Sequence, residues 1–149
     1  MAKFSYRMQN ILDIKYKMES QAKQNYVNAR MRLEEKQSEL ENLLKQKKHL
    51  EMQYRKSASG SINVRTLADL KYAIDYQKEQ IKNQYIEVKV AEKNFDIARA
   101  RLNEVMKDRK IHEKLREKAF DGFLAEMNEQ EKKEIDELTN FRYGLSQNN

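Results

Sequence analysis

The chain has 149 residues, 36% of them charged, with no proline, cysteine or tryptophan. Its mean hydropathy is −1.04, and helix-breaking residues are nearly absent, which is typical of long helices or coiled coils rather than of a globule. The missing cysteine excludes disulfides, cysteine zinc sites and thiol nucleophiles, and no apolar run is long enough to span a bilayer. The N-terminus lacks the apolar core of a signal peptide, so we expect a cytosolic protein.

The net charge of +6 is distributed unevenly along the chain. Residues 1–60 carry +6, residues 61–125 carry +3 and residues 126–149 carry −3. A basic body with an acidic tail favours contacts with polyanions or acidic proteins. Solvation of exposed helix faces explains the same charges equally well.

A first helix is predicted over about residues 4–56. Mostly apolar residues recur along one face of this helix and form a stripe, whose spacing is four residues rather than three between Ala22 and Tyr26. Such a stutter locally unwinds a coiled coil. The stripe recurs every three or four residues and reads Phe4, Met8, Ile11, Lys15, Met18, Ala22, Tyr26, Ala29, Leu33, Lys36, Leu40, Leu43, Lys47, Leu50 and Tyr54.

A turn is predicted within residues 57–65, the only Ser/Gly/Asn cluster in the chain. Gly60 can end a helix in the left-handed conformation. Ser61 and Asn63 are candidate N-caps, and Thr66 with Asp69 forms a second start signal. So short a connection makes the flanking helices antiparallel neighbours.

A second helix is predicted over about residues 66–142, followed by a frayed tail at 143–149. Twelve positions repeat at strict 3-4 spacing, the pattern of a coiled coil. These positions are Leu67, Leu70, Ile74, Gln77, Ile81, Gln84, Val88, Ala91, Phe95, Ala98, Leu102 and Val105. The two polar positions, Gln77 and Gln84, are candidates for fixing the helix register.

Folding back about the turn places residue i near residue 122−i, which predicts a single all-α domain, an antiparallel coiled-coil hairpin over residues 1–149. After Val105 the stripe changes phase and resumes at Ile111, Leu115, Ala119 and Phe123. Residues 121–142 have no counterpart on the first helix and are expected to overhang. Gly122 inside this run is either a flexible point or a site of close packing.

No catalytic, cofactor-binding or metal-binding motif is present. His49 and His112 lie far apart without ligand spacing, and isolated helix faces offer no cleft that perturbs a carboxylate pKa. We therefore expect no enzyme, no cofactor and no small-molecule substrate. Basic residues alternate with acidic ones, which argues against nucleic acid as a partner. Tyr54, Tyr72, Tyr76 and Tyr85 form either a protein-binding patch or a shield along the seam.

Several segments resemble the flagellar export protein FliJ family. They are the opening Phe-Ser-Tyr-Arg at 4–7 with Leu12 and Lys15, the Gln-Tyr-Arg at 53–55, the run Glu-Lys-Leu-Arg-Glu-Lys-Ala-Phe at 113–120, and the run Glu-Lys-Lys-Glu-Ile-Asp-Glu-Leu at 131–138. The resemblance covers nearly the whole chain in order and length.

The resemblance implies a non-enzymatic stalk, similar to the γ subunit of rotary ATPases, that serves flagellum assembly and so motility. Its terminal end would enter the hexameric ring of the export ATPase, and its body would meet the membrane protein of the export gate. Export chaperones are further implied partners. The implied location is the cytoplasm, at the inner face of the plasma membrane.

Carried over by position, the gate contact would comprise residues near the turn. They are Leu50, Tyr54, Tyr72, Ala73, Tyr76, Gln77, Gln80 and Gln84. The contact with the ATPase ring would comprise residues near the termini. They are Phe4, Tyr6, Arg7, Lys114, Leu115, Arg116, Lys118 and Phe120.

Other functions fit the same pattern. The chain is alternatively the stalk of a related type III secretion system or a generic coiled-coil scaffold. A basic polyanion-binding protein is the least favoured interpretation.

Overall fold

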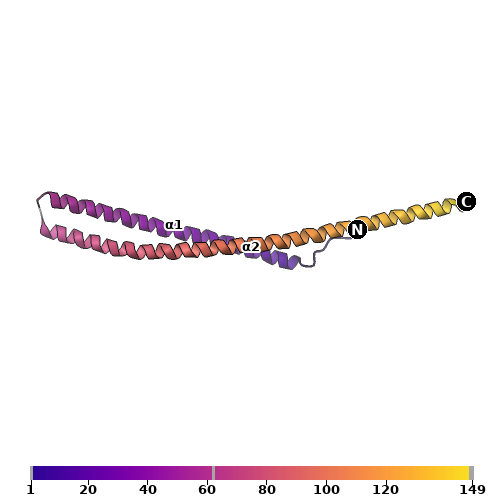
Figure 1. Ribbon diagram of the computed structural model, residues 1–149, viewed down its shortest axis with the longest axis horizontal. Helices are drawn as coiled ribbons and strands as arrows, with labels where there is room; N and C mark the ends of the chain where they lie inside the picture. Colours follow the sequence, from indigo (N-terminus) through magenta and orange to yellow (C-terminus); the bar gives the residue numbers. More distant parts are fainter. Residues whose placement is uncertain (1, 62, 148–149) are drawn as a thin grey trace. The chain divides into compact units, whose positions relative to one another are not determined.

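The computed structural model describes residues 2–61 and 63–147, the last two of these by their backbone alone. Two helices make up the chain, α1 (Gln9–Ser59) and α2 (Val64–Gln147), and the described residues contain no strand (Figure 1). The helices run antiparallel, joined by a short connection. The prediction of an all-α antiparallel hairpin is therefore confirmed.

The start of α1 differs from the predicted start near Phe4. Residues 2–6 are not helical, and the amide of Gln9 donates to the carbonyl of Tyr6 at 3.1 Å as the first turn forms. Phe4 instead packs its ring against two phenylalanines of α2, described below. This tertiary contact outweighs the local preference for helix. At its other end α1 extends to Ser59, three residues beyond the predicted end at 56.

The connection between the helices is shorter than the predicted turn at 57–65. Asn63 caps α2, because its Oδ1 accepts hydrogen bonds from the amides of Arg65 at 3.1 Å and Thr66 at 3.4 Å. The start signal at Thr66 is therefore inside the helix. Gly60 does not adopt a positive φ, so the predicted left-handed C-cap is wrong.

Helix α2 continues through both of its glycines. It passes Gly122 and Gly144 without a positive φ and ends at Gln147, beyond the predicted end at 142. The predicted frayed tail at 143–149 is thus helical as far as the structure describes it, and residues 148–149 lie outside the described residues. No helix in the described part of the chain is both long and apolar enough to cross a membrane.

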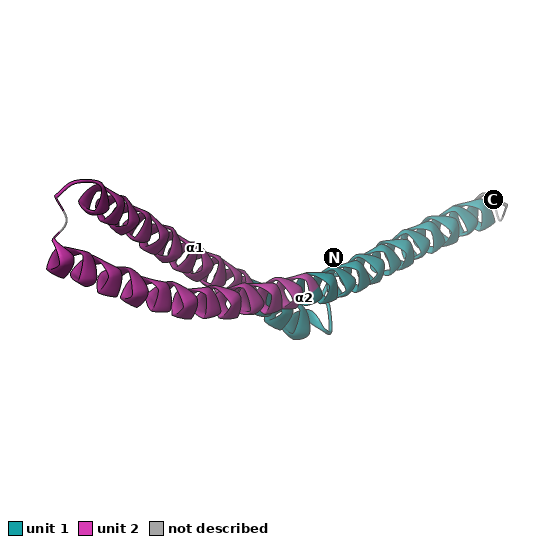
Figure 2. Ribbon diagram, turned by 60° about the vertical axis from the view of Figure 1, so that its left-hand side comes forward, with its two compact units in different colours: residues 1–19, 104–149 teal, residues 20–103 magenta. Residues whose placement is uncertain are grey.

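The chain divides into two compact units (Figure 2). Unit 1 comprises residues 1–19 and 104–149, and unit 2 comprises residues 20–103. In both units the seam follows the 3-4 stripe of α2. All twelve stripe positions from Leu67 to Val105 are buried or half-buried, as predicted.

The register of unit 2 agrees with prediction to within one residue. The 122−i rule places Tyr26 opposite Asp96, and the Tyr26 ring lies 5.3 Å from the ring of Phe95. The same rule places Lys36 opposite Ile86, and the Lys36 ammonium binds Glu87 at 3.1 Å. A regular stripe on both helices therefore determines the pairing here.

Unit 1 is packed differently from the prediction. Leu12 is only 2% exposed, whereas the predicted seam residue Ile11 is exposed. On α2, Ile111, Leu115 and Ala119 are also exposed, so the predicted change of phase is wrong. The 3-4 spacing continues from Val105 to Arg109 and His112, which brings polar side chains onto the seam. Glu113, next to His112, is also half-buried.

The unpaired end of α2 begins later than predicted. Phe123 and Met127 are half-buried, whereas every side chain from Asn128 to Leu145 is exposed. We refer to residues 128–147 as the overhang. At 1.5 Å per residue it is about 30 Å long.

Candidate functional site

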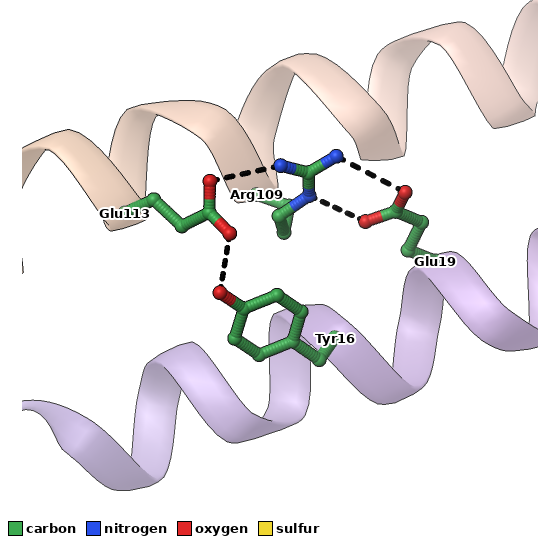
Figure 3. Close-up of polar contacts among 4 residues, drawn as sticks. All are labelled: Tyr16, Glu19, Arg109 and Glu113. Atoms are coloured by element: carbon green, nitrogen blue, oxygen red, sulfur yellow. Dashed lines mark hydrogen bonds and ion pairs between the residues drawn. The ribbon is translucent and has the colours of Figure 1, made fainter.

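A polar cluster joins the two helices of unit 1 (Figure 3). Arg109 donates through Nε and Nη2 to the two carboxylate oxygens of Glu19, at 2.5 and 3.2 Å. Its Nη1 donates to Glu113 at 2.9 Å, and the hydroxyl of Tyr16 donates to the other oxygen of Glu113. The guanidinium thus links α2 to Glu19 of α1 through a bidentate contact and binds Glu113 of its own helix through a single one.

The hydrogen bonds of this cluster shift the pKa of three of its members. The hydrogen bond from Tyr16, followed by that from Arg109, lowers the pKa of Glu113. The bond to Glu113 raises the pKa of Tyr16, and the bond to Glu19 raises that of Arg109. These three shifts all lead away from neutral pH, where a general acid or base would titrate. The cluster is therefore suited to holding helices together rather than to moving protons.

An aromatic cluster closes the terminal end of unit 1. The ring of Phe4 lies 5.1 Å from that of Phe120, edge to face, and 5.4 Å from that of Phe123. The guanidinium of Arg116 lies 5.5 Å from the Phe4 ring centre and donates to Gln9 at 2.8 Å. Phe4, Arg116 and Phe120, three of the residues predicted to contact the ATPase, are thus brought together.

A cavity of about 530 Å³ lies beside this cluster. Tyr6 and Arg7, both predicted ring contacts, line it together with Phe4, Ser5, Met8, Ala119, Gly122, Phe123 and Glu126. A Cβ built at Gly122 would meet nothing within 4 Å. Gly122 is therefore not required by close packing within this chain. The remaining residues predicted to contact the ATPase are exposed on α2 and do not join the aromatic cluster. They are Lys114, Leu115 and Lys118.

The predicted gate contacts divide into two groups. Gln77 and Gln84 are buried in the seam of unit 2, where their amides bind α1. Gln77 donates to the carbonyl of Leu43 at 3.3 Å and to Gln46 at 2.8 Å. Gln84 donates in the same way to the carbonyl of Lys36 and to Glu39. These two glutamines therefore serve the hairpin, and a partner cannot reach them without opening it.

The other predicted gate contacts are more accessible. Tyr72 is 76% exposed and Tyr76 is also largely exposed. Leu50, Tyr54, Ala73 and Gln80 are half-buried along the edges of the seam. The two tyrosines of α2 are thus the parts of this set that a partner can reach.

Comparison with known proteins identifies the family of this chain. Residues 4–148 match the family described as "Flagellar FliJ protein". The chain belongs to the FliJ family. No match was found among curated proteins.

A solved structure shares the fold of this FliJ family member. It is that of CT670 of Chlamydia trachomatis, described as a YscO homolog, with a TM-score of 0.75 and 19% sequence identity. The likeness covers 99% of each chain. Family membership indicates a component of a flagellar or related type III export system.

Two features of this FliJ family member were not anticipated from its sequence. The first is the polar cluster, whose signal was the helical spacing of Tyr16 with Glu19 and of Arg109 with Glu113, next to the stripes on which the seam was predicted. The second is a groove of about 190 Å³ in unit 2. Its walls are Arg32, Lys36, Ile86, Glu87, Val90, Ala91 and Asn94. A second row of apolar residues on α2, including Ile86 and Val90, was the available signal. The described residues contain no group of His, Asp or Glu suited to a metal ion.

Proposed function

We propose that this protein is a non-enzymatic stalk that connects the export ATPase ring to the membrane protein of the export gate. Family membership supports the export system as its setting. The observation that supports the role of a stalk is the packing of the N-terminal segment on α2 in unit 1. There the non-helical N-terminal segment packs Phe4 against Phe120, so that residues from both ends of the chain form one surface.

This terminal surface is suited to entering a ring. Its aromatic cluster is stiffened by Arg116, and the overhang beyond it is an unaccompanied helix. A single helix of about 10–12 Å diameter fits a narrower opening than a helix pair does. The overhang carries net negative charge, which suits a positively charged lining.

The loop end is the proposed contact for the gate. Tyr72 and Tyr76 project from α2 in unit 2 and are largely exposed. Exposed tyrosines are enriched at protein interfaces because they bury a large ring and offer a hydroxyl. We propose that this contact holds the protein at the inner face of the plasma membrane.

The ATPase contact is tested by measuring ATP hydrolysis by the purified flagellar export ATPase with and without the full chain. We expect stimulation that is lost when residues 128–149 are deleted, a truncation that keeps the Phe4–Phe123 contact. A Tyr72→Ser/Tyr76→Ser variant is the matched control and is expected to stimulate like the unaltered chain. No stimulation by the full chain would refute the proposal.

The gate contact is tested with the same variants. The tyrosine variant is expected to lose binding to the cytoplasmic part of the gate protein, while the truncated chain retains it. Each variant thereby loses one partner. Stimulation of an injectisome ATPase in preference to the flagellar one would support the stalk of a related type III secretion system instead.

A further inference from the structure

Unit 1 exposes an apolar face beside its polar seam. Met8, Ile11 and Ile14 lie near the start of α1, and Ile111 and Leu115 lie on α2; all five are exposed, Ile111 to 59%. We call these five residues the terminal apolar face. Apolar residues at helical spacing normally form the seam, but here Arg109 and Glu19 occupy it.

The two rows of this face lie on the same side of unit 1. The ion pair between Lys15 and Asp108, at 2.7 Å, marks that side. Ile11 lies four residues before Lys15, and Ile111 lies three residues after Asp108, so each shares a helix face with a member of the pair. The hydrogen bond from Tyr16 to Glu113 marks the opposite side.

The face runs into the cavity at Gly122. Ala119 and Gly122 follow Leu115 at four and seven residues, which keeps them on the same side of α2. Met8 lines the cavity from the other side. The terminal apolar face therefore has one apolar row on each helix, and small residues at one end allow the close approach of another helix. We refer to the strip between these two rows as the groove.

Basic residues border this groove. Lys107, Lys114 and Lys118 lie four before, three after and seven after Ile111, so they follow the same side of α2. All three are exposed, and none has an ion pair among the described residues. An acidic amphipathic helix has the complementary chemistry.

The overhang of this chain is such a helix. Ile135, Leu138 and Phe141 are each more than 60% exposed along one side. Glu134 and Glu137 lie one turn before Leu138 and Phe141, so acidic side chains follow the same side. Every described side chain of the overhang is exposed, and an apolar stripe on a helix is stabilised by burial against a partner.

We infer that two copies of this chain associate reciprocally, the overhang of each lying in the lysine-bordered groove of the other. The arrangement is symmetric, so both grooves and both overhangs are covered at once. It matches apolar residues with apolar residues and lysines with glutamates. The overhang is also the proposed ATPase contact, so this dimer is a state of the chain outside the ring, and it leaves the gate contact at Tyr72 and Tyr76 uncovered.

Sedimentation velocity over a range of concentrations tests this association, with two single variants of the full chain. Ile111→Asp alters the groove and Phe141→Asp alters the overhang. Each is expected to weaken the dimer at least about tenfold, as loss of a central apolar contact does. Ile97→Asp in unit 2 is the matched control, since Ile97 is also 59% exposed, and it should leave the dimer unchanged. Circular dichroism verifies that each variant keeps its helix content.

Mixing the two variants is the decisive measurement. Ile111→Asp retains an intact overhang and Phe141→Asp retains an intact groove, so the mixture forms one undamaged contact per pair. We expect the mixture to associate more strongly than either variant alone. Overhangs that pair only with each other would leave Ile111→Asp fully dimeric, and that result would overturn the inference. A chain that stays monomeric, or a mixture no stronger than its components, would also overturn it.

Discussion

The guanidinium of Arg109 on α2 donates hydrogen bonds to both carboxylate oxygens of Glu19 on α1, at 2.5 and 3.2 Å. Glu19 is only 5% exposed, so this carboxylate depends on protein groups rather than on water. The pair therefore occupies positions where a coiled coil ordinarily buries leucine or isoleucine. It holds unit 1 in an arrangement that leaves Ile11 and Ile111 outside.

Replacing one partner of this pair should be more damaging than replacing both. Arg109→Leu leaves the Glu19 carboxylate buried without its bidentate partner, and we expect a lower thermal unfolding midpoint. Adding Glu19→Leu should return the midpoint to at least that of the unaltered chain, because two leucines pack well on a seam. Thermal denaturation followed by circular dichroism measures both variants. A double variant less stable than Arg109→Leu would contradict this account.

The contact between Tyr16 and Glu113 should make stability depend on pH at both extremes. The pKa of Glu113 is lowered from 4.5, so its contribution is present above that pH and is lost as pH falls through the lowered value. The pKa of Tyr16 is raised from 10.0, so its contribution is present below pH 10 and is lost as pH rises through the raised value.

Two variants distinguish the loss of stability at low pH from the loss at high pH, in unfolding measurements from pH 3 to pH 11. Glu113→Gln should be less stable than the unaltered chain at pH 7, and the difference should shrink toward pH 3. Tyr16→Phe should likewise differ less from the unaltered chain above pH 10 than at pH 7. A difference that stays constant with pH would show that the contact does not contribute in this way.

Sequence periodicity determined unit 2 well because its stripe is regular on both helices. Tyr26 meets Phe95 one residue from the predicted position, because both residues lie on the predicted apolar stripes. The cap at Asn63 was also foreseeable, because its side chain is one of few that can satisfy the first amides of a helix.

Unit 1 could not be derived in the same way. Two stripes compete on each helix there, an apolar one through Ile111 and Leu115 and a polar one through Arg109 and Glu113. Choosing between them requires the energy of a bidentate ion pair relative to apolar burial, and that balance depends on geometry that periodicity does not contain. The fold of Phe4 back onto Phe120 has the same origin, because it depends on tertiary contact rather than on local preference.

The buried glutamines of unit 2 should lower the stability of the hairpin and fix the register of its two helices. Gln84→Leu and Gln77→Leu replace buried amides with side chains that coiled coils prefer, so the thermal midpoint should rise. The same variants should permit alternative pairings, because the bonds to the carbonyls of Lys36 and Leu43 are lost.

Distances between spin labels at exposed sites on α1 and α2 of unit 2 measure this effect. The unaltered chain should give one narrow distance distribution, and the double leucine variant a broader one. Val88→Leu is the control, since it changes an apolar seam residue without removing a hydrogen bond. A narrow distance distribution in the double leucine variant would show that the glutamines do not fix the register.

The cap at Asn63 should contribute measurably to hairpin stability. Asn63→Ala removes the acceptor for the amides of Arg65 and Thr66, and losing such a cap costs about 1 kcal/mol. Ser61→Ala, two residues earlier in the same connection, should have a much smaller effect. Chemical denaturation of the three proteins compares them directly, and equal losses for both variants would contradict the assignment of the cap.

The contact of Phe4 with α2 should decide whether the N-terminal segment stays in place. Phe4→Ala removes the ring that packs on Phe120 and Phe123 and lies beneath Arg116. Because residues 2–6 are not helical, no backbone ladder retains them once the ring is gone, and trypsin should cleave after Lys3 and Arg7 several-fold faster. Phe4→Leu keeps much of the apolar surface and should be cleaved at an intermediate rate. The global unfolding midpoint should change little in either variant, since the helices of unit 2 do not involve Phe4. If Phe4→Ala also loses ATPase stimulation while its helices remain folded, the ordered N-terminal segment is needed at the terminal end; unchanged cleavage would show that other contacts retain it.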